Sequence, residues 1–136
     1  MAKISGPLLD RIDMHLDVPA LPSKDILSRA AAESSSKIKE RTTSARRIQQ
    51  RRFENTQVFA NAQMNHQQIQ QFCTTDEEGR KLLKMAIEEL GLSARGYDKI
   101  LKIARTIADL AGSGQIQTEH LAEAIQYRSL DRNFFG

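Results

Sequence analysis

Hydrophobic residues recur at intervals of three and four over residues 92–111, which predicts a helix with one buried face. The apolar positions are Tyr97, Ile100, Leu101, Ala104, Ile107, Ala108 and Ala111. Ser93 is placed to cap the start of this helix, and Gly91 and Gly112 punctuate its two ends. We expect the rest of the chain to be organised around it.

Three more stretches carry a helical pattern, and short connections join them. The four helices are expected to begin at Asn65, Asp76, Ser93 and Glu119. Thr75 and Glu78 have the spacing of a capping box, and Thr118 is placed to cap the last helix. Short connections favour packing between helices that are neighbours in sequence. The sequence therefore predicts an all-α fold based on a compact four-helix bundle.

Residues 12–18 follow a different rule, because apolar and polar side chains alternate there. The apolar members are Ile12, Met14, Leu16 and Val18. A period of two predicts a half-buried strand, which Pro19 would stop. A single strand cannot form a sheet. We therefore expect this strand either to pair with another part of a larger protein or to be frayed.

The region between this strand and the bundle contains neither Gly nor Pro from Lys24 to Glu54. Ser23 is placed to cap a helix there, but the apolar stripe is sparse. The clusters at 34–36 and 42–44 weaken the middle, because Ser and Thr side chains compete for backbone hydrogen bonds. The pattern allows two helical pieces with a loose joint or one long helix.

Charge is concentrated in this helical region. The whole chain carries a net charge of +3, while residues 37–52 alone carry +6. A solvated helix surface is one interpretation. Contact with nucleic-acid phosphates or with a neighbouring subunit is the other, through Arg46, Arg47, Arg51 and Arg52. Aromatic residues are not interleaved with these arginines, so a DNA contact would be directed at the backbone and sensitive to salt.

Composition excludes several classes of protein. No run approaches the ~20 apolar residues of a membrane-spanning helix, and the N-terminus has no signal-peptide core, so we expect a cytoplasmic protein without a membrane partner. The lone Cys73 lacks a disulfide partner, and no metal-ligand spacing is found. The phosphate-binding loop GxxxxGK followed by Ser or Thr, the Walker A motif, is absent, as is an apolar strand ending in Asp-Glu, the Walker B motif. We therefore do not expect this chain to hydrolyse ATP alone.

Arg95 is the polar residue of the 92–111 helix that most needs an explanation. It falls in the first turn, where a cation opposes the positive end of the helix dipole at a cost of about 0.3–1 kcal/mol. A solvated surface arginine is one interpretation, and a ligand for an anion is the other.

Three segments resemble one family. They are LSARGYDKILKIARTIADLAG from Leu92, ISGPLLDRIDMHLDVP from Ile4, and HLAEAIQYRSLDR from His120. Together with NAQM at 61–64 they resemble the magnesium-chelatase-like AAA+ ATPases of the ComM/YifB competence-protein group, and the similarity runs from Ile4 to Arg132. The chain then looks like the C-terminal lid domain of such an ATPase.

The resemblance assigns roles to two arginines. Arg95 matches the sensor 2 arginine, which reaches the nucleotide phosphates, and Arg11 matches the arginine finger, which acts in trans on the ATP of a neighbouring subunit. A surface Arg11 paired with Asp10 or Asp13 is the alternative from the residues alone. Whether Arg95 acts within its own subunit or on a neighbour stays open.

The resemblance also divides the chain and supplies partners. Residues 1–22 would be the remnant of the AAA+ core with its last strand, 23–58 a basic helical insert, and 59–136 the lid with the sensor 2 helix. The parent protein would use ATP with Mg²⁺, and its partners would be its own core, neighbouring subunits of a hexameric ring and DNA. Lid motion would couple ATP hydrolysis to subunit movement. A free-standing nucleic-acid-binding module and a helical adaptor are the alternatives.

Overall fold

The structure is a computed structural model that describes residues 11–16, 18, 20 and 32–135, with side chains as far as Arg128. The described residues form helices and connecting turns, without a strand. The helices are α3 (Ser35–Arg52), η1 (Asn61–Gln63), α4 (His66–Phe72), α5 (Glu77–Leu90), α6 (Ala94–Leu110) and α7 (Thr118–Phe135). The expected all-α fold is therefore confirmed.

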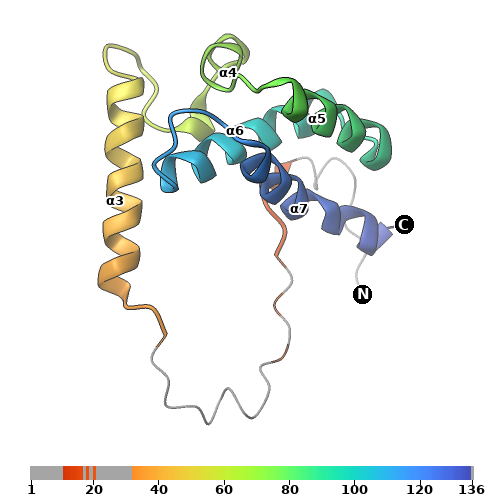
Figure 1. The fold of residues 1–136 in the computed structure, drawn as a ribbon, viewed down its shortest axis with the longest axis horizontal. Coiled ribbons are helices and arrows are strands. Elements are labelled where there is room, and N and C mark those ends of the chain that lie inside the picture. The colour runs from red at the N-terminus through yellow and green to blue at the C-terminus, as the bar shows by residue number, and fades with distance from the viewer. Residues whose placement is uncertain (1–10, 17, 19, 21–31, 136) are drawn as a thin grey trace.

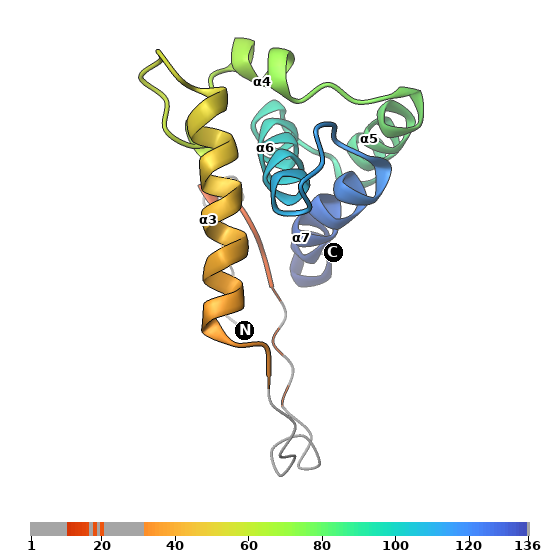
Figure 2. The ribbon, with the colours of Figure 1, turned by 60° about the vertical axis from the view of Figure 1, so that its left-hand side comes forward.

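Helix α6 lies at the centre of the molecule, as its pattern predicts. It packs against α7, α3, α4 and η1, while α5 packs against α7 on the other side (Figure 1). Figure 2 shows that α3 lies beside this bundle and not within it. Ile100, Ala104 and Ala108 are fully buried, whereas Ala111 lies just past the last turn and is exposed.

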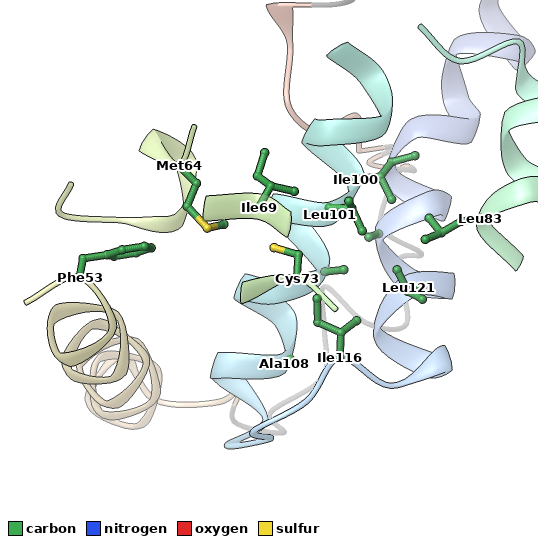
Figure 3. Close-up of a cluster of buried hydrophobic side chains, with 12 residues drawn as sticks. Phe53, Met64, Ile69, Cys73, Leu83, Ile100, Leu101, Ala108, Ile116 and Leu121 are labelled. Atoms are coloured by element: carbon green, nitrogen blue, oxygen red, sulfur yellow. The ribbon is translucent and has the colours of Figure 1, made fainter. Parts of the chain in front are cut away.

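The hydrophobic core gathers side chains from α4, α5, α6 and α7 and from Phe53 and Met64, the residues that end α3 and η1 (Figure 3). Phe53, the residue that ends α3, is only 2% exposed and meets Phe72 edge-to-face with ring centres 5.6 Å apart. Burying one large apolar side chain contributes about 1.5–3 kcal/mol. Phe53 is therefore the apolar anchor of α3.

The starts of two helices agree with the sequence, and those of two others need correction. Asn65 forms a capping box with Gln68, and the Ser93 hydroxyl accepts the Gly96 N–H at 3.0 Å. The α5 cap, however, is Asp76, which accepts the Gly79 N–H at 2.8 Å, and not Thr75. The Asp carboxylate is the better acceptor at the positive helix end.

The start of α7 also differs from the prediction. Thr118 is the first helical residue and not the cap. The Gln117 N–H donates to Nδ1 of His120 at 2.9 Å, so a histidine takes the place that Glu occupies in an ordinary capping box. The carbonyl of Gln117 in turn accepts the N–H groups of His120 and Leu121.

Helix α3 is continuous from Ser35 to Arg52 and contains residues 42–44 without a break. Ser34 caps its start by accepting the Lys37 N–H at 3.3 Å. The Thr42 hydroxyl donates to the Lys39 carbonyl at 3.0 Å, so this side chain is satisfied within the helix. The cap expected at Ser23 lies outside the described residues.

The strand expected over 12–18 is not formed in the described residues 12–16 and 18. The segment has no partner strand there and runs beside α7 instead, where the His15 N–H donates to the Tyr127 carbonyl at 2.8 Å. Met14, Leu16 and Val18 remain exposed. The predicted half-buried strand is therefore absent from these described residues, because strand formation depends on a partner strand.

Candidate anion-binding groove

A groove of about 770 Å³ lies between α3, the segment around Asp13 and α6. Its cationic lining is Arg41, Arg95, Lys99 and Lys102, and its carboxylates are Asp13, Asp98 and Glu123. Apolar lining comes from Ile103, Ile107 and Leu110. An apolar base with a few charged groups is the usual composition of a small-molecule site.

Helix α6 supplies one side of the groove through its own periodicity. Residues 95, 99, 102 and 106 recur at steps of three and four, so they share one helix face. This face is separate from the buried stripe that carries Ile100 and Ala104. Helix α6 therefore contributes one face to the core and another to the groove.

Arg95 is the cation of the groove whose side chain is exposed and makes no hydrogen bond or ion pair with the described residues. The other three cations are engaged. Lys99 Nζ donates to the Arg11 carbonyl at 3.1 Å and to the Asp13 carboxylate, and Lys102 Nζ donates to the Ala62 carbonyl at 3.1 Å. Arg41 donates to Glu33 at 2.8 Å. An anion entering the groove would meet Arg95, which has no partner among the described residues, and Lys102, which donates only to a neutral carbonyl.

The structure brings the segment that carries Arg11 close to the turn that carries Arg95. The Arg11 side chain is exposed, and its carbonyl is held by Lys99, one helical turn after Arg95. Arg128 of α7 donates to the next carbonyl, that of Ile12, at 2.5 Å. Sequence reasoning missed Arg128, although it falls in register with the inward-facing Leu121 and Ala124.

Arg52 requires a correction, because it was expected to belong to an outward-facing basic surface. Its side chain is only 11% exposed and forms a bidentate pair with Asp109, with Nη2–Oδ1 and Nη1–Oδ2 distances of 2.6 and 2.8 Å. Asn61 bonds to both partners at 2.8 Å. The guanidinium also lies 5.9 Å from the ring centre of Phe53. Arg52 therefore fastens α3 to α6.

A second buried arginine shares the same carboxylate. Arg105 Nη2 lies 3.2 Å from Asp109 Oδ1 and 2.7 Å from the Ser113 carbonyl. Burial lowers the pKa of Arg105, and the Asp109 charge acts in the opposite direction. Burial raises the pKa of the nearby Cys73 thiol to about 11, although Arg105 and Arg52 oppose that shift. Asp109 is thus the charge that makes two buried arginines compatible with the core.

The other three predicted basic residues, Arg46, Arg47 and Arg51, are exposed on α3. The buried residues Ala45 and Gln49 define the opposite, bundle-facing side. Arg46, Arg47 and Arg51 therefore form a basic arc, which lies away from the interface between α3 and the bundle.

The described residues hold neither a cluster of metal ligands nor a membrane-spanning helix. No group of three or more His, Cys, Asp or Glu side chains that could hold a metal ion occurs among them. None of the helices in the described part of the chain is long and apolar enough to cross a membrane.

The fold and the groove define a small helical-bundle domain that presents an exposed arginine at the start of its central helix. The chain belongs to the family described as magnesium chelatase, subunit ChlI C-terminal, whose model matches residues 32–128. The resemblance expected from the sequence is confirmed at this level.

Curated relatives extend the similarity over nearly the whole chain. The uncharacterized protein YifB of Salmonella typhimurium is 41% identical over 132 residues, and the YifB protein of Escherichia coli is 42% identical over 132 residues. The competence protein ComM of Haemophilus influenzae is 39% identical over 131 residues. Each alignment covers 96% of this chain but only 25% of the relative. The chain thus spans about a quarter of the length of these relatives.

Proposed function

We propose that this chain acts as the lid of a cytoplasmic AAA+ ATPase and supplies two arginines to nucleotide sites that its parent protein completes. Arg95 would contact nucleotide phosphates as the sensor 2 residue, and Arg11 would act on the ATP of a neighbouring subunit. The observation that carries the proposal is the exposed, unengaged Arg95 in a groove whose other cations already have partners.

Arg95 is the groove residue that suits a phosphate group, and it lies in a lining that also holds Asp13, Asp98 and Glu123. A guanidinium offers several N–H donors in a fixed plane, which suits phosphate oxygens. Metal and phosphate-loop chemistry would come from the core of the parent protein, where ATP and Mg²⁺ would be held. In this chain, Arg95 of α6 and Arg11 of the segment fastened to α6 would bind and orient the nucleotide phosphates.

Lid movement would then connect nucleotide state to subunit motion. A helical bundle joined to a core through an extended segment can move as a rigid body when a ligand bridges the two parts. We further propose that the assembled ring acts on DNA. The exposed Arg46, Arg47 and Arg51 support this, as does the name competence protein carried by one relative.

The test is steady-state ATPase activity of the assembled parent protein with Arg95→Ala or Arg11→Ala. Loss of a finger arginine should lower kcat by about 10³-fold or more. Loss of one donor that stabilises phosphate charge should lower it by about 10²–10³-fold. Arg80→Ala, at an exposed arginine of α5 outside the groove, is the matched control and should leave turnover unchanged. Unchanged turnover in both groove-side variants would contradict the proposal.

A free-standing nucleic-acid-binding module remains the second candidate, because the basic arc of α3 is solvent-exposed. A DNA-binding measurement on the 136-residue chain alone distinguishes this module from the proposed lid. Binding to duplex DNA through this arc would weaken with a log–log salt slope of about 0.9 per phosphate contacted. Tight binding with such a slope, abolished by Arg47→Ala with Arg51→Ala, would favour the module. The lid proposal predicts weak binding by the chain alone.

A further inference from the structure

The segment that carries Arg11 is fastened to the bundle at three successive points. Lys99 of α6 donates to the Arg11 carbonyl at 3.1 Å and forms an ion pair with Asp13. Arg128 of α7 donates to the Ile12 carbonyl at 2.5 Å. The His15 N–H donates to the Tyr127 carbonyl at 2.8 Å. Two different helices thus hold one short stretch of backbone.

The two donors are largely buried, whereas the Asp13 carboxylate that pairs with Lys99 is 62% exposed. Arg128 is 2% exposed, and the side chain of Lys99 is 14% exposed. Hydrogen bonds to charged donors are stronger than neutral ones, and partial burial protects them from screening by salt. The guanidinium of Arg11 is left exposed, because only its carbonyl is engaged. The contacts therefore fix the position of the Arg11 backbone and leave its guanidinium available to a ligand.

The same turns of α6 carry the groove arginine. Lys99 follows Arg95 by one helical turn on the same face. Gly96, next to Arg95, faces Arg128: a Cβ at Gly96 would lie 3.5 Å from Arg128 Nη2. The first two turns of α6 therefore carry Lys99 and lie against Arg128, the two side chains that hold the segment of Arg11.

We propose that Lys99 and Arg128 are positioning residues that couple the two arginine sites. A helix transmits movement as a rigid body, so a shift of α6 in response to a phosphate at Arg95 moves the Arg11 segment with it. Arg11 is then presented to the neighbouring subunit according to whether a phosphate is bound at Arg95. This inference rests on the proposed function, because it assumes the roles given there to Arg95 and Arg11.

The test is a double-mutant cycle on kcat in the assembled parent protein, with Lys99→Met, Arg11→Ala and the pair. Lys99→Met removes the ammonium but keeps the aliphatic stem. Losing one charge-assisted hydrogen bond should lower kcat by about 10- to 100-fold, with the KM for ATP unchanged. Because Lys99 acts through Arg11, adding Lys99→Met to Arg11→Ala should change kcat by less than about twofold.

Two further variants separate positioning from general structural damage. Lys99→Arg retains a cation and should recover most of the activity. Lys81→Met alters an exposed lysine of α5, 76% exposed, and should behave as the unaltered protein. The coupling would be overturned if Lys99→Met lowered kcat equally in the wild-type and Arg11→Ala backgrounds, or did not lower it at all. The proposed function would stay intact in either case. If Arg11→Ala itself left kcat unchanged, the role proposed for Arg11 would fail, and the coupling with it.

Discussion

Asp109 is a buried residue whose replacement should strongly lower the free energy of unfolding. It is 2% exposed and accepts from Arg52, Asn61 and Arg105 at once. Asp109→Asn keeps the shape but leaves two buried cations without their counter-charge. Removing one partner of a buried ion pair typically costs about 3–5 kcal/mol. We expect the free energy of unfolding, measured by urea denaturation of this chain, to fall by that amount.

Glu77→Gln is the matched control for this change. The Glu77 side chain is 85% exposed, and its ion pair with Lys81 spans one helical turn of α5. Exposed pairs of this kind contribute about 0.3–0.5 kcal/mol. If Asp109→Asn cost no more than Glu77→Gln, the buried arginine cluster would not be what fastens α3 to α6.

The burial of Cys73 leads to a prediction about the pH-dependent reactivity of its thiol. Its pKa is raised from 9.0 to about 11 by burial, so the thiol stays protonated in the folded chain where an exposed thiol would ionise. Since two pKa units correspond to a hundredfold difference in thiolate, alkylation by iodoacetamide at about pH 8 should be at least about 100-fold slower in the folded than in the urea-unfolded chain.

The sign of the linkage follows from the same shift. Below the unfolded pKa both states bind the proton, and stability is unaffected. Above it the unfolded chain loses the proton first, so this thiol's contribution disfavours the folded state as pH rises from about 9 toward about 11. Alkylation at equal rates in folded and unfolded chain would contradict the buried placement of Cys73.

Single residues show where sequence reasoning reaches its limit. Arg95 was selected because a cation in the first turn opposes the helix dipole, and the structure places it exposed in the groove. Arg52 was misplaced because a run of basic residues does not tell which member turns inward. That choice depends on Asp109, which is 57 residues away in sequence. Long-range pairing of charged groups is not encoded in local periodicity.

At the scale of elements, the packing of α5 on α7 rests on a close approach at Gly79. A Cβ added there would lie 2.8 Å from Cδ1 of Leu121, which is fully buried, and 3.1 Å from Cβ of Thr75. Overpacking costs about 1–3 kcal/mol, while Ala in a helix recovers up to about 1 kcal/mol. We therefore expect Gly79→Ala to destabilise the chain by about 1 kcal/mol in urea denaturation.

Gly114→Ala is the matched change at an open position. A Cβ there would meet nothing within 4 Å, and the backbone does not require glycine. Such a substitution should be neutral or stabilise by about 0.4–1 kcal/mol. Equal stabilities of the two variants would contradict the close packing of α5 against Leu121.

Helices were predictable as elements because their apolar period is local. The central helix and its Ser93 cap follow from the sequence, and so does the Asn65 cap of α4. The segment at 12–16 was predicted as a strand and forms none, because strand formation depends on a partner that periodicity does not identify. The groove lies where α3, this segment and α6 meet, so its existence also depends on tertiary packing.

At the scale of the whole molecule, the fastening of the Arg11 segment can be measured on this chain without nucleotide. The His15 amide donates to Tyr127 across the contact between the segment and α7. Lys99→Met should speed hydrogen exchange of that amide by about tenfold or more, because local opening follows the loss of neighbouring contacts. The Gly91 amide, bonded to Ile87 at the end of α5, serves as an internal reference and should not change.

Lys81→Met is the control for that experiment, and it should leave both amides unchanged. Faster exchange at His15 and Gly91 together would indicate global destabilisation by the Lys99 substitution. Unchanged exchange at His15 would mean that Lys99 does not hold the segment.

The most direct test of the account is ATPase activity in mixed rings of the parent protein. One subunit type carries Arg11→Ala with an intact nucleotide site, and the other carries an intact Arg11 with an inactivated phosphate-binding loop. If Arg11 completes a neighbour's nucleotide site as proposed, each type alone should be inactive. If Arg11 acts on a neighbour, mixing the two should restore activity wherever an intact site meets an intact Arg11. Mixed rings as inactive as either parent would contradict the account.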